Sequence, residues 1–498
     1  MANPWRSLRV KDLTLLLIFF VFCIVLWSAF RSGEEQQKPQ DWLSLLKQSA
    51  APEQAPQQGA DFPHGDLPGP TSLRQIPTKI PDLSFACPPC PAMPAANGQH
   101  DETFQAVQPA TNLEFLALRK WNEERQRAKM LVIHDADIAV RNESVYSVTL
   151  KQQTAPSGDK HDYLSLAKYF WPDPSKQDGL PYIGRDGHIN PEVETVRDYR
   201  LLRQMMREVG VMGQAYFWTG DAKYAKKACY RLNEWFLHPE TKMNPNLKYA
   251  SFRKGTEEGR RTGVLDLMQV YRMFDGIKYL QASEYYTKEL HEGLQNWFIE
   301  YYDWFYNSKQ GKLERNAHNN HGTYYDVQHI ALLRFLGRVE EARAVAEEAK
   351  TKRILRQVKP NGWQPGETER PTGWFYSAFN LQGLMLLAQQ AKLVQVDLWN
   401  YEGPNGESIK KAVDYLLPYA LTEGEGWPYK NIKGFDIEEF YKVLRVSYLV
   451  YGDPTHLQGL ETLAERRMKE NKRKGMKPPN DYICDLGIIT NGHMWNCW

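Results

Sequence analysis

The sequence predicts an all-α domain, an (α/α) toroid, over residues 111–498, preceded by two N-terminal segments. Three observations support this fold class. Apolar residues recur at helical spacing through most of the domain, strand-like alternation is scarce, and apolar segments end three times at a glycine. A region of this length can bury one large hydrophobic core.

The first element is a predicted membrane-spanning helix. Leu13–Phe30 is eighteen residues long and uncharged, it follows basic residues, and no small-residue cleavage site comes after it. A removable signal peptide usually has a shorter apolar region and such a site. Because basic residues precede the helix, the rest of the chain is expected in a lumen or outside the cell. We therefore expect a single-pass type II membrane protein, with residues 1–30 as its cytoplasmic tip and signal anchor.

The second element is a predicted stalk over 31–110. It holds 13 of the 30 prolines of the chain among Gln, Ala and Gly, without sustained periodicity, which is typical of a disordered linker. One N-glycosylation sequon, Asn142-Glu143-Ser144, follows on the exported side, so a glycoprotein is expected.

The cysteines allow one disulfide near the C-terminal end of the chain. Cys87 and Cys90 form a C-P-P-C without the context of a redox motif and without a second pair for zinc. An oxidising compartment would allow a disulfide between Cys484 and Cys497.

The helices of the domain are predicted from their periodicity, in order, over 112–131, 196–218, 224–237, 263–280, 284–306, 324–336, 342–355 and 374–393. Three breaks join helix pairs: F-W-T-G-D at Phe217–Asp221, F-L-G-R at Phe335–Arg338 and V-Y-G-D at Val450–Asp453. In each, one helix ends at a glycine and the next begins at once. Their spacing of about 115 residues is a hint of stacked α-hairpins, as in a toroid or solenoid.

The composition restricts the partners. The formal net charge is +2 and there is no basic run or recognition fold, so nucleic acid is not a predicted partner. Aromatic residues make up 12% of the chain, with 15 Trp and 27 Tyr. Aromatic rings fill helical cores, and they also stack on sugar rings, so the composition is compatible with a carbohydrate ligand.

Three polar, aromatic segments stand between the predicted helices, at 156–174, 316–326 and 361–380. A helical domain needs only short links. We therefore expect these segments to form long loops around a binding site.

The side chains of the second and third segments suit one difficult reaction, removal of the C5 proton of a uronate. The adjacent carboxylate must be neutralised before a carbanion becomes accessible. Asn320 and His321 can donate hydrogen bonds, and Arg370 supplies a fixed charge. Tyr376 can take the proton if a nearby cation lowers its pKa from about 10, and it can return a proton to the departing glycosidic oxygen. The four residues predict a polysaccharide lyase that acts by β-elimination.

Three other interpretations stay open. His318 and His321 could hold a metal if they share a helix face, although no third ligand is evident. Glu367 and Glu369, beside Asp326, could be the acid and base of a glycoside hydrolase. The chain could also be a non-catalytic carbohydrate-binding membrane protein.

Two segments carry a resemblance to a known family. N-N-H-G-T-Y-Y-D-V-Q from Asn319 and E-T-E-R-P-T-G-W-F-Y-S-A-F-N-L from Glu367 resemble the alginate-lyase superfamily of α/α-toroid polysaccharide lyases. The stretch S-G-D-K-H-D-Y…Y-F-W-P-D-P is similar to the N-terminal cleft segment of that family. The resemblance runs from roughly Glu114 to Leu421.

The resemblance implies an incomplete (α/α) barrel with a long groove for an anionic polysaccharide, such as alginate or polyglucuronate. It implies Asn320 and His321 near the uronate carboxylate, Arg370 assisting, and Tyr376 as base and acid. His321 would be the base for the epimer whose C5 proton lies on the opposite face. No cofactor is needed. The expected substrate-binding residues are Lys160, His161, Tyr163, Trp171, Tyr324, Trp363, Gln364 and Glu369.

The chain departs from the family pattern at three positions near the arginine. Pro371 follows Arg370, Gly373 stands two residues later, and Thr368 replaces the usual Leu. These departures put the identity of the substrate in doubt more than the chemistry.

Overall fold

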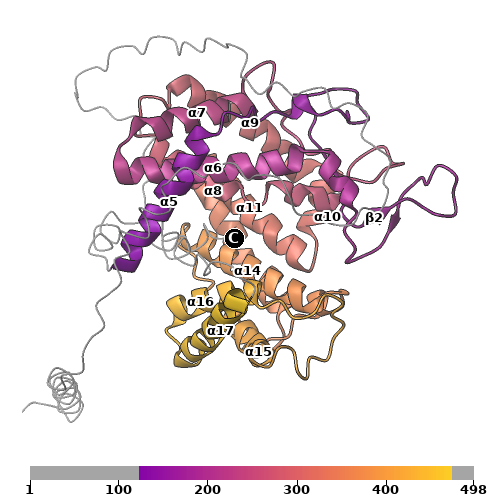
Figure 1. The fold of residues 1–498 in the computed structure, drawn as a ribbon, viewed down its shortest axis with the longest axis vertical. Helices are drawn as coiled ribbons and strands as arrows, with labels where there is room; N and C mark the ends of the chain where they lie inside the picture. Colours follow the sequence, from indigo (N-terminus) through magenta and orange to yellow (C-terminus); the bar gives the residue numbers. More distant parts are fainter. Residues whose placement is uncertain (1–122, 474–498) are drawn as a thin grey trace, which may run out of the picture. The chain divides into compact units, whose positions relative to one another are not determined.

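The chain folds mainly into α-helices, as the periodicity of the sequence predicts (Figure 1). The computed structural model describes residues 123–473, which all belong to one unit of the chain, Gln75–Trp498. The predicted membrane helix, the stalk over 31–110 and the predicted disulfide between Cys484 and Cys497 lie outside the described residues. Within 123–473, no helix is both long and apolar enough to cross a bilayer.

The α-helices are α5 (Glu123–Arg141), α6 (Asp198–Thr219), α7 (Ala222–Phe236), α8 (Val270–Leu280), α9 (Lys288–Asn307), α10 (Lys309–Arg315), α11 (Asn320–Phe335), α12 (Val339–Ala349), α13 (Pro365–Thr368), α14 (Gly373–Lys392), α15 (Ile409–Leu421), α16 (Glu438–Tyr451) and α17 (Pro454–Arg473). A π-helix, η4 (Lys350–Leu355), continues α12, and 3₁₀-helices form η1 (Val148–Leu150), η2 (Pro191–Thr195) and η3 (Arg261–Leu267). The strands are β1 (Leu164–Leu166), β2 (Phe170–Trp171), β3 (Ile183–Gly184) and β4 (Tyr249–Phe252).

The three glycine breaks join helices that pack on each other, as predicted. Gly220, Gly337 and Gly452 all have φ between 62° and 73°, the left-handed conformation that ends a helix. Each stands between two consecutive helices, α6 and α7, α11 and α12, and α16 and α17, and each of these pairs is in contact. Asp221 caps α7 by accepting a hydrogen bond from the backbone N–H of Lys223.

Two predicted loops are largely helical. Asn319 is extended, and its side chain accepts a hydrogen bond from the backbone N–H of His321, so α11 begins at Asn320. The segment 361–380 contains α13 and the first turns of α14. A side-chain cap at one end and tertiary packing at the other favour helix where the polar composition predicts a loop.

Close helix crossings require glycine at specific positions. A Cβ on Gly213 of α6 would lie 2.4 Å from the carbonyl oxygen of Gly276 on α8, so both helices must carry glycine where they cross. The contact at Gly383 of α14 is looser: an added Cβ would lie 3.0 Å from the ring of Tyr324 on α11, so that ring would have to shift. These crossings hold α6, α8, α11 and α14 together in the core.

Many aromatic residues of the chain fill this core. Phe236, Trp297, Phe298 and Tyr301 are buried, and their rings contact each other edge-on or stacked. The aromatic composition therefore serves the core to a large extent, and it is not by itself a signal of sugar binding.

Two small sheets position the N-terminal polar segment. β1 pairs with β4 in parallel and β2 pairs with β3 in antiparallel. Because Lys168 and Tyr169 lie between β1 and β2, both sheets fix the backbone on either side of them.

Candidate active site

One cavity of about 1020 Å³ lies where the N-terminal ends of four helices meet. The first turns of α6, α11, α14 and α16 supply lining residues, which include Tyr199, Arg203, Asn320, His321, Phe375, Tyr376, Glu439 and Lys442. The N-terminal end of a helix carries partial positive charge, so this convergence favours an anionic ligand.

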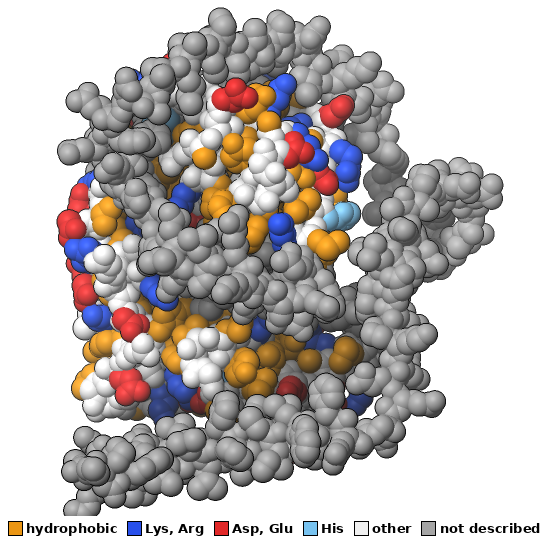
Figure 2. All heavy atoms as spheres, turned by 90° about the vertical axis from the view of Figure 1, so that its left-hand side faces the viewer, with side chains coloured by type: hydrophobic (Ala, Val, Ile, Leu, Met, Phe, Trp, Pro, Cys, Tyr) orange, Lys and Arg blue, Asp and Glu red, His pale blue; other side chains and the backbone are white. Residues whose placement is uncertain are grey.

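The lining is strongly cationic. Eight basic side chains line the cavity and only four acidic ones do, and the basic ones are Lys168, Arg185, Arg200, Arg203, Arg260, Arg261, Arg370 and Lys442. Burial and the charges of Arg261 and Arg253 lower the pKa of Arg260, which shows that like charges are crowded there. The face of the molecule shown in Figure 2, unlike the cavity lining, carries acidic and basic side chains without a clear excess of either.

Tyr376 is held at the centre of a polar network. Its hydroxyl accepts a hydrogen bond from Nη2 of Arg370 at 2.9 Å and lies 3.0 Å from the hydroxyl of Tyr169. The guanidinium carbon of Arg370 lies 3.8 Å from the centroid of the Tyr376 ring. Arg370 is itself fixed by Asp186, which accepts from Nε at 2.8 Å and from Nη2 at 2.7 Å. This bidentate pair leaves Arg370 little freedom beside the phenol.

The pKa of Tyr376 is not lowered overall, although Arg370 has the expected effect. Burial and the hydrogen bond with Tyr169 raise the pKa of Tyr376 above its ordinary value, although Arg370 acts in the opposite direction. One neighbouring cation does not outweigh the desolvation of a phenolate. At neutral pH the Tyr376 hydroxyl is therefore protonated and is able to donate a proton.

Asn320 is anchored by Glu367. The backbone N–H and the side-chain Nδ2 of Asn320 each donate to a different oxygen of Glu367, both at 2.6 Å. Burial raises the pKa of Glu367 to about 7, although the two hydrogen bonds from Asn320 and the charge of Arg370 lower it. Glu367 does not line the cavity, whereas Asn320 does. Glu367 thus fixes the orientation of the Asn320 amide from behind.

His321 has a carboxylate partner of its own. Its Nδ1 contacts Oε1 of Glu314, which is fully buried and whose other oxygen accepts from Arg261. A neutral imidazole that donates from Nδ1 to a carboxylate carries its free lone pair on Nε2. Because His321 lines the cavity, this arrangement suits proton abstraction there.

A buried ion pair supports the start of α11. Arg353 binds Asp326 through Nε at 2.6 Å and Nη2 at 3.0 Å, and it donates to the carbonyl oxygens of Arg315 and Ala317. An added Cβ on Gly322 would lie 2.3 Å from Nη1 of Arg353. The glycine after Asn-Asn-His therefore makes room for the guanidinium that holds the preceding loop.

Of the predicted substrate-binding residues, Tyr324 lines the cavity, and it stacks on Phe379 at 4.5 Å between ring centroids. The other seven are not among the lining residues: Lys160, His161, Tyr163, Trp171, Trp363, Gln364 and Glu369.

Hydrogen bonds inside the protein account for several of these positions. Tyr163 is buried and donates to Asp266 at 2.9 Å. Gln364 is buried and binds Asn380 and the carbonyl oxygen of Ser377. The indole of Trp363 donates to Thr368.

The remaining positions are also engaged or exposed. Trp171 donates to the carbonyl oxygen of His188, and His161 contacts the carbonyl oxygen of Lys242. Lys160 and Glu369 are exposed. These residues are predicted from their polar or aromatic character, which does not reveal which face of a loop points into a cavity.

The turn with the unusual residues is tied to a distant segment. Pro371 accepts a hydrogen bond from the backbone N–H of Ile432, and the N–H of Gly373 donates to the carbonyl oxygen of Lys430. A Cβ on Gly373 would lie 3.2 Å from that carbonyl oxygen. Pro371 and Gly373 therefore stand where two backbone segments approach each other closely.

The sequence does not predict three residues of the site: Tyr169, Asp186 and Glu314. Tyr169 lies two residues before Trp171, in the segment 156–174 that is predicted to reach the cleft. The prediction of the segment therefore holds, but its aromatic residue at the site is Tyr169 and not Trp171. Asp186 is 184 residues from Arg370 and carried no sequence signal. Glu314 is seven residues before His321 and lies in α10, outside the polar segment that was singled out.

The alternative sites lose their geometric support in the described residues. His318 precedes α11 and contacts Arg356 at 2.9 Å, so it does not share a helix face with His321. Within 123–473, no group of three or more His, Cys, Asp or Glu side chains could hold a metal ion. For a hydrolase, Asp326 is committed to Arg353 and Glu367 is buried behind Asn320.

The chain is similar in sequence and fold to known proteins. A family model described as alginate lyase matches residues 147–427, more than half of the chain. The solved structure of an alginate lyase from Bacteroides ovatus is 33% identical with a TM-score of 0.67, and the alignment covers 77% of this chain and 98% of that one. Alginate lyase A1-III from Sphingomonas species A1 is 14% identical with a TM-score of 0.48, and 72% of this chain and 93% of that one are covered. A search of curated proteins found no match.

Proposed function

This chain belongs to the alginate lyase family and is a polysaccharide lyase, and on that premise we propose that it cleaves β-linked polyuronates by β-elimination. The observation that carries the proposal is the contact of Arg370 with the Tyr376 hydroxyl in a cationic cavity that Asn320 and His321 also line. The Bacteroides ovatus structure is described as an alginate lyase, which supports alginate-like polymers as the substrate class. The helix pairs support the incomplete (α/α) barrel that the resemblance implies.

In the proposed reaction, a uronate carboxylate binds beside Arg370 and Asn320. Nε and Nη2 of Arg370 are engaged by Asp186, so Nη1 is the nitrogen that can reach the substrate. The second hydrogen of the Asn320 amide can donate to the same carboxylate, because only one bond to Glu367 is made from Nδ2. Neutralising the carboxylate stabilises the negative charge that develops when the C5 proton leaves.

The proton transfers then complete the elimination. A base removes the C5 proton, the C4–O bond breaks, and the electron pair of the C–H bond becomes the C4=C5 double bond. The departing glycosidic oxygen receives a proton from an acid. The products are a new reducing end and a 4,5-unsaturated uronate at the new non-reducing end.

Two assignments of acid and base are compatible with the residues. Tyr376 could serve as both when the proton and the leaving oxygen lie on one face of the sugar. His321 would be the base, and Tyr376 the acid, when they lie on opposite faces. The raised pKa of Tyr376 suits it to donate the proton in either assignment, and the contact of His321 Nδ1 with Glu314 suits His321 to be the base for the opposite-face epimer.

A polymer screen tests the proposal. Purified protein is incubated with polymannuronate, its C5 epimer polyguluronate, and polyglucuronate, and the ultraviolet absorbance of the unsaturated product is followed. We expect absorbance to rise with at least one polymer. A hydrolase would release reducing ends without this absorbance, and that result would overturn the elimination mechanism.

Comparing the epimers separates the two assignments. If His321 is the base, His321→Gln abolishes turnover of the polymer whose proton and leaving oxygen are on opposite faces. If Tyr376 serves as both, the same variant retains part of its turnover on the other epimer, whereas Tyr376→Phe retains none.

We also propose that the enzyme is anchored by Leu13–Phe30 with its catalytic domain in a lumen or outside the cell. The argument is the length, the lack of charge and the basic flank of that segment. Alkaline carbonate extraction of membranes tests it. The full chain should stay in the membrane pellet and a chain that starts at residue 31 should not, and release of the full chain would contradict the anchor.

A further inference from the structure

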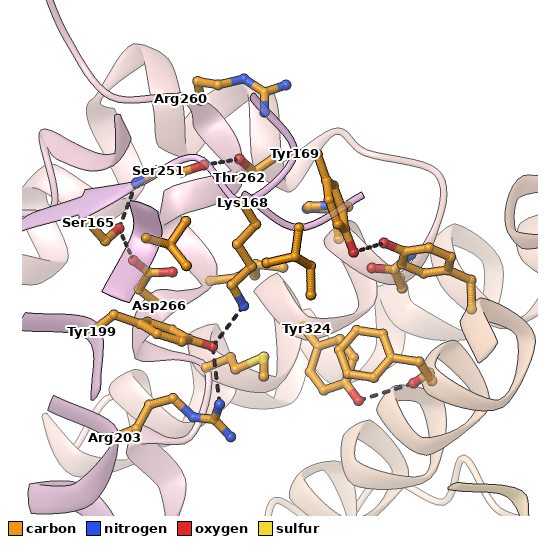
Figure 3. Close-up of a pocket in the computed structure, with 18 of the residues that line it drawn as sticks. Ser165, Lys168, Tyr169, Tyr199, Arg203, Ser251, Arg260, Thr262, Asp266 and Tyr324 are labelled. Carbon is orange, nitrogen blue, oxygen red and sulfur yellow. Dashed lines mark hydrogen bonds between the residues drawn. The ribbon is translucent and has the colours of Figure 1, made fainter. Parts of the chain in front are cut away.

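A second cluster of cations lies in the same cavity, away from Tyr376. Lys168 comes from the segment between β1 and β2, and Tyr199 and Arg203 come from the first turns of α6. Figure 3 shows these three side chains gathered on one side of the cavity, with Tyr169 and Tyr324 across from them.

The two cations share a single neutral acceptor. Nζ of Lys168 donates to the Tyr199 hydroxyl at 3.3 Å, and Nη1 of Arg203 donates to the same oxygen at 3.2 Å. Both also lie over the Tyr199 ring, at 4.5 Å and 5.4 Å from its centroid. The phenol therefore positions two positive charges side by side without neutralising either of them.

Neither cation is paired with a carboxylate among the described residues. Asp266, which also lines the cavity, accepts hydrogen bonds from Tyr163 and Ser165 on its Oδ2 and interacts with Lys168 and Arg203 through its charge. Nε of Arg203 is buried and has no hydrogen-bond partner in this part of the chain. This contrasts with Arg370, whose guanidinium is held bidentately by Asp186. Two adjacent cations without an ion-pair partner are what a bound anion would satisfy.

From this geometry we infer that Lys168 and Arg203, held by Tyr199, form a subsite for the carboxylate of a second uronate unit of the polymer. The inference rests on the proposed function and extends it, because it requires a substrate with more than one uronate in the cavity. The cavity of about 1020 Å³ lies at the upper end of the range for drug-sized ligands and can hold more than one sugar ring. Fixed charges at two places along the groove would select polymers in which uronates recur at the matching spacing.

The test compares substrate lengths. KM and kcat are measured on a series of uronate oligomers of increasing length, for the natural protein, Lys168→Gln, Arg203→Gln and the double variant. For the natural protein, KM should fall sharply once the oligomer reaches the subsite. Each single variant should raise KM about tenfold on long oligomers, which corresponds to one charge-assisted contact, and lower kcat much less. The double variant should lose the length dependence.

The matched control is Arg338→Gln. Arg338 also lies over a tyrosine ring, that of Tyr302, at 4.6 Å, but it does not line the cavity. Its KM should not change at any length. Circular dichroism and the melting temperature establish that all variants are folded.

Each remaining outcome decides the proposal. If the double variant keeps the natural length dependence of KM, or raises KM equally on the shortest cleaved oligomer, the subsite is overturned. If the variants lose inhibition by dextran sulfate but keep their KM on polyuronates, the cluster binds sulfate esters and the carboxylate assignment is wrong. If the natural protein cleaves no polyuronate, the proposed function is wrong. The subsite is then tested by calorimetry, in which the double variant should bind a long uronate oligomer more weakly than the natural protein.

Discussion

Arg370 donates from Nη2 to the hydroxyl of Tyr376 at 2.9 Å, and this contact joins the two predicted catalytic residues of the segment 361–380. The cation lies against a phenol whose pKa is nevertheless raised, because burial and Tyr169 outweigh it. The pair therefore presents a protonated hydroxyl and a fixed positive charge to one ligand. That combination suits an acid that acts beside a bound carboxylate.

Tyr376→Phe should lower kcat about 10²–10⁴-fold, because a positioned proton donor contributes that much to catalysis. Binding should be retained, since the ring and Arg370 remain. The measurement is kcat by product absorbance, with calorimetric binding of an oligomer. Tyr325→Phe is the control: it also removes the hydroxyl of a buried tyrosine, whose partner is the carbonyl oxygen of Phe305, but outside the cavity lining. Equal losses in both variants would contradict a role in the reaction.

Asp186→Asn should lower kcat about tenfold or more, because Arg370 loses the carboxylate that fixes its Nε and Nη2. The hydrogen bond from Arg370 also lowers the pKa of Asp186, so the pair is intact at neutral pH. Asp173→Asn, in an exposed turn outside the lining, should not change kcat. An unchanged kcat for Asp186→Asn would show that Arg370 needs no support.

Glu314→Gln should lower kcat about tenfold or more, because His321 loses the carboxylate that fixes its tautomer and ring orientation. KM should change little, because Glu314 does not line the cavity and His321 stays in place. Steady-state kinetics on a long polyuronate separate the two parameters. An increase in KM with kcat unchanged would assign Glu314 to substrate binding and contradict its action through His321.

Glu367 should make stability depend on pH. Its pKa is raised to about 7 in the folded protein from the ordinary 4.5, so the folded state keeps a proton that the unfolded state loses. The contribution to stability is fully present below about pH 4.5 and is lost as the pH rises through about 7. Urea unfolding at pH 5 and pH 8 measures it, and the loss is on the order of 3 kcal/mol.

The Glu367→Gln variant isolates this contribution. Because Gln does not titrate, the variant should lose much less stability between pH 5 and pH 8 than the natural protein does. If the natural protein and the variant lose the same stability between the two pH values, other groups are responsible.

Asn142 should carry no glycan, although its sequon predicted one. Both hydrogens of its Nδ2 are used, by the Tyr146 hydroxyl at 2.6 Å and by Glu208 at 3.2 Å. A glycan on Nδ2 would remove one of these hydrogens and would have to displace buried partners. The mass of the Asn142 peptide from protein secreted by a glycosylating host measures this. A mass decrease of the intact protein after enzymatic deglycosylation, traced to Asn142, would contradict the expectation.

Much of the fold and part of the site could be predicted from the sequence because the signals are local. Helical periodicity located α6, α7, α9 and α14, and the Gly-Asp breaks located the turns between paired helices, since capping and left-handed glycine depend on a few adjacent residues. The helix α15 was not predicted, and it contains Pro418, which removes one of its backbone hydrogen bonds.

The sequence by itself determined which side chains could do the chemistry: an amide and an imidazole in one short run, and a guanidinium and a phenol six residues apart. Only the tertiary structure decided how they are supported, because Asp186 and Tyr169 reach the site from elements distant in the chain and Glu314 turns toward His321 from the preceding helix. It also decided the sign of the pKa shift of Tyr376 and which polar residues face inward. Burial and side-chain direction depend on contacts between helices, and no pattern within one segment encodes them.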